Sequence, residues 1–90
     1  MEVLNLEPVA DRGGGMRTVA LFDLQLTPEI RMHGLRLMEA PDGNQFTYAA
    51  KCGQRRAATF ARPLAEKITA AASLIYKAVT ANGTDSEKAA

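Results

Sequence analysis

A short basic stretch is the part of this sequence whose residue types could do chemistry. Residues 51–63, KCGQRRAATFARP, contain no acidic residue and four basic ones: Lys51, Arg55, Arg56 and Arg62. Guanidinium groups match the geometry of phosphate oxygens, and Gly53 lets the backbone approach a ligand closely. The stretch therefore predicts a phosphate-binding loop. On composition alone, a solvated charged loop is the alternative.

The stretch leads into a predicted C-terminal helix, which sharpens the phosphate hypothesis. Arg62 precedes Pro63, and proline fits the first turn of a helix. The N-terminal end of a helix carries partial positive charge, so a cation there is unfavourable unless an anion joins it. Lys67 and Lys77 add basic charge from the helix, on the side away from its apolar residues. For these two lysines, routine solvation of the helix is the competing interpretation.

The overall charge is too small for a domain that is basic throughout. Lys and Arg number 11 against 10 Asp and Glu, and the sequence pI is about 7.9. Nucleic-acid-binding domains are usually more basic, so any positive field here must be local. Arg36 and Arg31 are second-rank candidates on a predicted strand. Arg31 alternatively pairs with Glu29 or Asp23 across a hairpin, a surface contact that contributes little.

Two aromatic residues lie just before the basic stretch. Phe46 and Tyr48 could stack on bases, as aromatic residues do in proteins that bind single strands. Aromatic residues in strands belong more often to the core, and we expect Phe46 to be a core residue.

Catalytic and metal-binding residues are sparse. His33 and Cys52 are the only histidine and cysteine, and a lone residue of either type is more often packed than paired as a nucleophile. One cysteine allows neither a disulfide within the chain nor a Cys-based zinc site, and His33 has no neighbour at ligand spacing. We therefore expect no enzyme, no metal, no cofactor and no small-molecule substrate.

Several antiparallel strands must precede the basic stretch. Residues 3–9 end near Pro8 and suit an edge strand. Residues 17–26 alternate, which predicts a core face and a half-covered face with Val19 and Leu21. The core-facing residues of this strand are Ala20, Phe22, Leu24 and Leu26.

Turns and one irregularity divide the following residues. TPE at 27–29 predicts a hairpin turn, and APDGN at 40–44 predicts a second turn. Between them the apolar parity changes, which predicts a β-bulge near His33 and Gly34. A further strand starts with Phe46 and Tyr48, and residues 57–61 fit either a short fifth strand or a helix.

The last element is an amphipathic helix. Its apolar stripe recurs at helical spacing: Leu64, Ile68, Ala71, Ala72, Ile75 and Val79. Asn82 and Gly83 predict its end, so that residues 84–90 form a disordered tail. The fold class is therefore α+β, in which an antiparallel sheet of four to five strands is followed by one C-terminal helix that lies on a curved sheet.

Size and composition predict one small domain, residues 1–83. With 90 residues, of which 47% are hydrophobic and 23% charged, the chain should fold, but its core is small and a partner chain is expected. The start MEVLNLEPVADRGGG lacks the basic head and apolar run of a signal peptide, and no segment is apolar enough to cross a membrane. We expect a soluble cytoplasmic protein with no membrane partner.

The order of residues resembles the stage V sporulation protein G (SpoVG) family, whose members are septation regulators. The resemblance covers about residues 16–80, in RTVALFDLQLTPEIRMHGLRLMEAPDGNQFTYAAK followed by FARPLAEKITAAASLIYKAV. The residues that match the family pattern are His33, Leu35, Arg36 and Leu37 in a central strand, Gly43 and Asn44 in a turn, Phe46 in the next strand, and Ala61, Pro63 and Leu64 before the helix. The sequence departs from that pattern at Ala50 and Arg62, and in a shorter loop after Cys52.

The resemblance implies a small α+β homodimer that binds nucleic acid and regulates transcription or septation in bacteria. It assigns binding to the basic loop and the start of the helix, which here are Lys51, Arg55, Arg56, Arg62 and Lys67, with Arg36 and Lys77 as secondary candidates from the charge pattern. DNA is the favoured ligand and RNA the alternative. A rival function is a bacterial or phage accessory module that uses a strand edge or helix face of the same fold to bind a protein.

Overall fold

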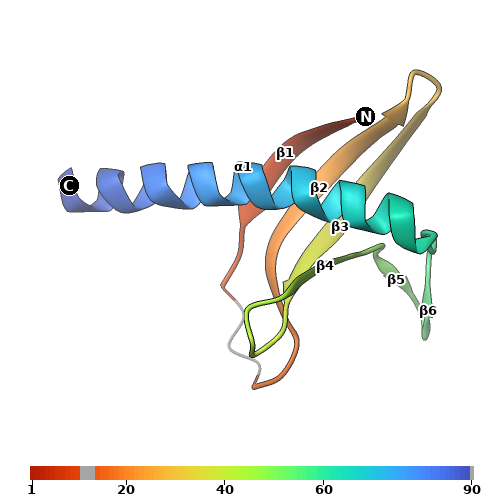
Figure 1. Ribbon diagram of the computed structural model, residues 1–90, viewed down its shortest axis with the longest axis horizontal. Coiled ribbons are helices and arrows are strands. Elements are labelled where there is room, and N and C mark those ends of the chain that lie inside the picture. Colours follow the sequence, from red (N-terminus) through yellow and green to blue (C-terminus); the bar gives the residue numbers. More distant parts are fainter. Residues whose placement is uncertain (11–13, 90) are drawn as a thin grey trace.

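The protein is a four-stranded antiparallel sheet with one long helix across one of its faces (Figure 1). The computed structural model describes residues 1–10 and 14–89, with side chains described as far as residue 81. The strands follow the chain order β1-β2-β3-β4, and their bounds are β1 Glu2–Pro8, β2 Arg17–Thr27, β3 Ile30–Glu39 and β4 Gln45–Tyr48. Two short strands, β5 (Lys51–Cys52) and β6 (Arg55–Arg56), precede the helix α1 (Arg62–Ala89). The predicted α+β class is confirmed.

Both predicted turns are confirmed and have local causes. In the β2–β3 turn, the hydroxyl of Thr27 accepts hydrogen bonds from the backbone N–H groups of Glu29 and Ile30, at 3.2 and 3.1 Å. In the β3–β4 turn, the N–H of Gly43 donates to the carbonyl of Ala40 at 2.9 Å, and Gly43 has a φ of 92°, which glycine adopts without steric cost. These two tight connections join β2, β3 and β4, and the order of the strands leaves β1 and β4 at the edges of the sheet.

The predicted bulge in β3 is also confirmed. Phe22 lies opposite Leu35 and Leu24 opposite Met32, so β3 has one more residue than β2 over this interval. The extra residue falls at His33 and Gly34, and Gly34 has a φ of 69°. The bulge shifts the side-chain alternation of β3 and places Leu35 on the core face.

A second bulge, in β2, corrects the prediction for Val19. Thr18 pairs with Met38 and Ala20 with Leu37, which leaves Val19 as an inserted residue. Its side chain is 5% exposed and belongs to the core, whereas the prediction put it on the half-covered face. Leu21 does lie on that face and is 37% exposed.

The core lies between the sheet and α1. Ile68 and Ala72 are fully buried, and Leu64, Ala71 and Ile75 pack partly buried beside them, as the apolar stripe predicts. On the sheet side, the largest fully buried side chains are Phe22, Leu24, Leu35 and Leu37. The opposite side of α1 is exposed at all five predicted positions, which are Lys67, Ala70, Leu74, Lys77 and Ala81.

Two predictions for the C-terminal half are wrong. Residues 57–61 form neither strand nor helix; the extra pairing lies earlier, where Gly53, with a φ of 68°, permits a two-residue turn between β5 and β6. The helix does not end at Asn82 and Gly83 but continues to Ala89. An Asn-Gly pair allows a helix to end without forcing it, and the following residues include no proline and several good helix formers.

Candidate nucleic-acid interface

The basic stretch forms a small hairpin that is anchored to the end of β4. Lys51 pairs with Arg56 and Cys52 with Arg55 across β5 and β6. The guanidinium of Arg56 donates to the carbonyl of Ala49 at 2.9 Å. It also lies 4.8 Å from the centroid of the Tyr48 ring. Arg56 is therefore held in place, and it ties the hairpin to the sheet by a hydrogen bond and a cation–π contact.

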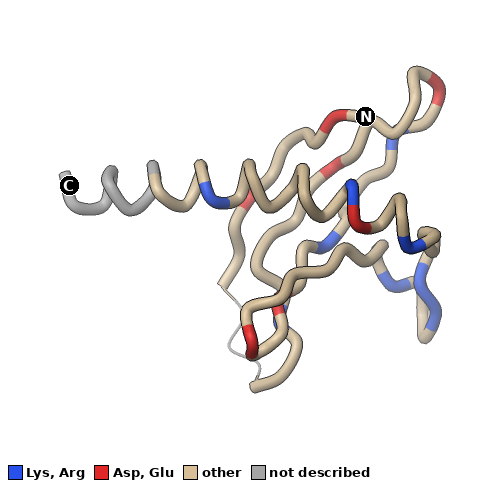
Figure 2. Tube along the Cα trace, in the orientation of Figure 1, with Lys and Arg blue, Asp and Glu red and all other residues tan. Residues whose placement is uncertain are grey.

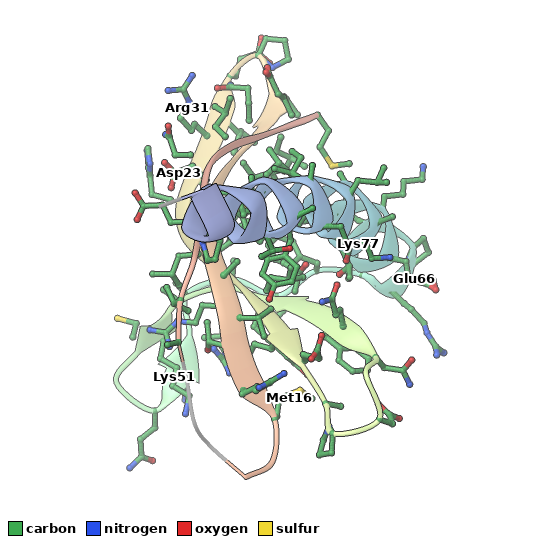
Figure 3. All side chains as sticks on the ribbon, turned by 90° about the vertical axis from the view of Figure 1, so that its left-hand side faces the viewer. Met16, Asp23, Arg31, Lys51, Glu66 and Lys77 are labelled. Carbon is green, nitrogen blue, oxygen red and sulfur yellow. The ribbon has the colours of Figure 1, made fainter. Side chains whose placement is uncertain are left out.

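The other two cations of the hairpin are free for a ligand. Lys51 and Arg55 are exposed, and within residues 1–10 and 14–81 neither makes a salt bridge. Figure 3 shows Lys51 on the side of the molecule that faces away from α1, with Lys77 on the opposite side. The hairpin thus adds its charge to the uncovered face of the sheet.

The uncovered face, called the open face below, presents a row of residues that leads to the hairpin. Register pairs Leu21 with Arg36 and Arg36 with Tyr48, so these three side chains share one face of the sheet. A second row contains Met38 and Phe46. The sheet thereby places the secondary candidate Arg36 beside Tyr48, and so beside the hairpin cations.

Among the residues whose side chains the structure describes, none forms an ion pair with Arg36. Its Nε–H is buried and donates to no acceptor in the described part of the chain. Neither of the ion pairs found in that part includes Arg36. Because Nε itself is buried, an acceptor from outside the chain would have to bind the terminal nitrogens of this half-buried guanidinium.

Phe46 lies on the open face rather than in the core, which corrects the prediction. Its side chain is 41% exposed, whereas its neighbour Thr47 is only 7% exposed. The Thr47 hydroxyl lies 2.8 Å from that of Thr69 on α1, and Ala49 is buried on the same side. Because side chains alternate along a strand, Phe46 and Tyr48 must point the other way.

Phe46 also connects the hairpin with the start of the helix. It lines a groove between β4 and the first turns of α1, which includes Arg62 and Glu66. It lines a second groove that includes Tyr48 and Arg56. Two predicted cations, Arg62 and Arg56, therefore lie on grooves that share one aromatic side chain.

The remaining helix lysines are not part of this arrangement. Lys67 and Lys77 are exposed on α1, and Figure 3 shows Lys77 on the side away from Lys51. Figure 2 shows basic residues at the β5–β6 hairpin and at the start of α1, and Lys77 comes 15 residues after Arg62 along the helix. The structure thus brings together Lys51, Arg55, Arg56 and Arg36, sets Arg62 beside them, and separates Lys77 from them.

Two acidic residues of the sheet, Asp23 and Glu39, have local partners. Hydrogen bonds from the Asn5 side chain and the Gly34 N–H, both 3.0 Å, lower the pKa of Asp23, and His33 at 3.6 Å adds to the effect. Bonds from Arg17 at 2.9 Å and Gln45 at 3.0 Å lower the pKa of Glu39. Neither carboxylate pairs with a cation of the hairpin.

Acidic residues lie at one end of the open face and basic residues at the other. Glu7 on β1 lies opposite Leu21, at the end of the row that leads through Arg36 to Tyr48. In Figure 3, Asp23 and Lys51 lie on the same side of the sheet but at opposite ends of it. An anionic ligand on this face would therefore be drawn toward β4 and the hairpin.

Two residues considered for other chemistry lie in separate surroundings. The ring of His33 has Asp23 as its partner, and Cys52 is exposed on the hairpin. Among the residues that the structure describes, no group of three His, Cys, Asp or Glu side chains could hold a metal ion. The predicted contact of Arg31 with Glu29 or Asp23 is also replaced, since Arg31 donates to the side chain of Gln25 at 2.6 Å.

Comparison with known proteins gives no match. No protein-family model matches the chain, and no curated sequence or solved structure is significantly similar to it. Within residues 1–10 and 14–89, α1 is the single helix, and it lacks the long apolar run that crossing a bilayer would require.

Proposed function

We propose that this protein binds nucleic acid through the β4 end of its open face and the β5–β6 hairpin. The observation that carries the proposal is the convergence of Lys51, Arg55, Arg56 and Arg36 beside Tyr48 and Phe46, with no carboxylate paired to any of the four among the described residues. Cations next to exposed aromatic rings are the usual composition of nucleic-acid-binding surfaces.

The cations differ in the role they suit. Lys51 and Arg55 are exposed and suit contact with phosphates, which positions the ligand without reading its sequence. Arg56 already donates to Ala49 and stacks on Tyr48, so its position is fixed before a ligand arrives. A fixed guanidinium loses less side-chain entropy on binding than a free one.

The resemblance to the SpoVG family supports a wider form of this proposal. It suggests a homodimer that acts as a regulator in the bacterial cytoplasm, on DNA or on RNA. A dimer would duplicate the basic surface and add a second set of phosphate contacts. Light scattering tests the dimer separately. A monomer at all concentrations would contradict the proposed dimer but not the proposed binding site of one subunit.

Charge reversal at the hairpin tests the proposed function. The double variant Arg55→Glu, Arg56→Glu should abolish binding to single- and double-stranded DNA and RNA in a gel-shift panel. Lys77→Glu is the matched control because it reverses one charge on the opposite side of the molecule. Equal binding by all three proteins would contradict the proposed site.

A second function, binding of a protein partner, is favoured by one observation. β4 forms an edge of the sheet, and the grooves along it contain the exposed ring of Phe46. Unpaired strand edges accept an added strand from another chain. If the double charge reversal leaves association with a partner protein unchanged, and no oligonucleotide binds the natural chain, this second function replaces the first.

A further inference from the structure

We infer that the ligand of this surface is a single strand, and that its bases stack on Phe46 and on the Arg56–Tyr48 pair. This inference rests on the proposed function and narrows its ligand class. Its main observation is that two aromatic side chains project from the uncovered face of β4, one on each side of the inward-facing Thr47.

The exposed ring of Phe46 and the outer side of the Arg56 guanidinium can stack only on bases whose own faces are uncovered. In a duplex, each base face is covered by its neighbours, and a protein reaches only the base edges and the phosphates. In a single strand, bases can be splayed and stacked on aromatic or guanidinium planes. Phe46 is 41% exposed and alternates with Thr47, which faces α1, so its ring is open to a base.

The spacing of the two positions favours splayed bases. Residues two apart in a strand are separated by about 6.7 Å, since each residue advances the strand by about 3.3–3.4 Å. Stacked bases on one strand are about 3.4 Å apart. Two successive bases on Phe46 and on the Arg56–Tyr48 pair would therefore be separated by about twice the stacked distance. An extended single strand meets this condition, and a duplex does not.

Arg56 supplies the second stacking plane. Its guanidinium covers the Tyr48 ring at 4.8 Å from the centroid. One terminal nitrogen is used by the carbonyl of Ala49, which fixes the plane. The other donors of the group remain for a phosphate or a base edge, and the outer side of the plane can stack on a base.

Cations lie on both sides of the two stacking positions, where they could contact the phosphates of a bound strand. Arg62 lines the groove on one side of Phe46, and Lys51 and Arg55 lie beyond Tyr48 on the hairpin. The unpaired guanidinium of Arg36 lies beside Tyr48 in the neighbouring strand. A strand that runs along β4 would thus meet phosphate partners before, beside and after the two stacking positions.

Affinity for oligonucleotides of different base content tests the inference. Fluorescence anisotropy should show that oligo-dT binds at least about 10-fold more tightly than an abasic oligomer of equal length and charge, and more tightly than a duplex, because stacking adds to phosphate binding. Phe46→Leu should weaken oligo-dT binding by about 5- to 100-fold and leave abasic binding unchanged. Leu21→Ala, an exposed apolar position on the same face, is the control and should change neither.

Tyrosine fluorescence provides a readout that a structural role would not change. The chain has two tyrosines and no tryptophan, so a Tyr76→Phe background leaves Tyr48 as the single tyrosine reporter. Stacking near Tyr48 should quench its emission with oligo-dT but not with the abasic oligomer.

The outcomes separate this inference from the proposed function. Equal affinity for oligo-dT, abasic oligomer and duplex, all lost on charge reversal of Arg55 and Arg56, would overturn base stacking and keep nucleic-acid binding. Absence of binding to every oligomer at low salt would overturn both. Binding of a protein at the β4 edge with no oligonucleotide bound would also overturn both.

Discussion

The two faces of the sheet are built from alternate residues of the same strands, yet they differ in almost every property. Under α1 the face is apolar and closed, with Phe22, Leu35 and Leu37 buried. The other face carries Arg36 and Phe46, the sequence neighbours of the buried residues Leu37 and Thr47. The face under α1 therefore stabilises the fold, whereas the residues of the open face contribute little to folding and are available to bind a ligand.

The largest expected effect comes from matched truncations on the two faces. Phe22→Ala should lower the free energy of unfolding by about 3–5 kcal/mol, because it leaves a cavity in the core. Phe46→Ala removes the same ring from the open face and should cost about 1 kcal/mol or less. Urea unfolding followed by circular dichroism measures both, and similar losses would show that the two faces contribute equally to folding.

The next effect concerns affinity rather than stability. The double variant Arg55→Glu, Arg56→Glu should weaken binding by about 100-fold or more, since two phosphate contacts become repulsions. Its free energy of unfolding should fall by about 1–2 kcal/mol, because Arg55 is exposed but Arg56 contributes one hydrogen bond and one cation–π contact. A variant that unfolds would have to be replaced by Arg55→Glu alone, which should weaken binding by about 10-fold.

The dependence of affinity on salt concentration reports the number of phosphate contacts. Four phosphate contacts, from Lys51, Arg55, Arg36 and Arg62, predict a slope of log affinity against log salt of about −3.6 for duplex DNA, and about −2.8 for a single strand. A dimer that engages both sites would double these values. A slope near zero would contradict phosphate binding by the basic surface.

The smallest expected effect is the loss of stability on replacing Asp23, at the acidic end of the open face. The pKa of Asp23 is held below its ordinary value of 3.8, chiefly by the Asn5 side chain and the Gly34 N–H. Its stabilisation is therefore present above the pKa of the unfolded chain and is lost as the pH falls through the lower pKa of the folded state. Asp23→Asn should reduce stability at pH 7 by about 1 kcal/mol or less.

A pH series of unfolding curves checks this sign. The difference between the natural chain and Asp23→Asn should shrink as the pH falls below about 4. A difference that grows on acidification would mean that the Asp23 carboxylate destabilises the fold. Oligonucleotide affinity should be unaffected by this change, since Asp23 and Lys51 lie at opposite ends of the sheet.

The fold was predictable where local pattern decides it. Alternation in β2 identified Ala20, Phe22 and Leu24 as core residues, and the parity change in β3 located the bulge at His33 and Gly34. In both segments the apolar residues themselves mark the buried face. The helix stripe was read in the same way, and its inward and outward faces are as expected.

The errors for Phe46 and Val19 arose because contacts with residues distant in the sequence decide the burial there. Thr47 is buried because it meets Thr69 on α1, 22 residues along the chain, and this contact turns Phe46 outward. Val19 is buried by a bulge that depends on the register with β3, which its own neighbours do not reveal. For Phe46, the small residues Thr47 and Ala49 at alternate positions were the available signal.

The composition of the sequence identified the basic residues, but it did not predict how they are arranged in space. The two-residue strands β5 and β6 are too short to show any periodicity, so the stretch reads as a loop in the sequence. The secondary candidate Arg36 joins the hairpin only through the pairing of β3 with β4. The separation of Lys77 from the hairpin likewise depends on where α1 lies on the sheet.

The most direct test is a map of the oligonucleotide contact surface. An isotope-labelled sample titrated with oligo-dT and followed by amide NMR should show its largest shifts in β4 and the β5–β6 hairpin, with smaller shifts at the first turn of α1. The outer face of α1 around Leu74 and Lys77 should be unchanged. Shifts confined to that outer face, or no shifts at low salt, would contradict the assignment of nucleic-acid binding to the open face.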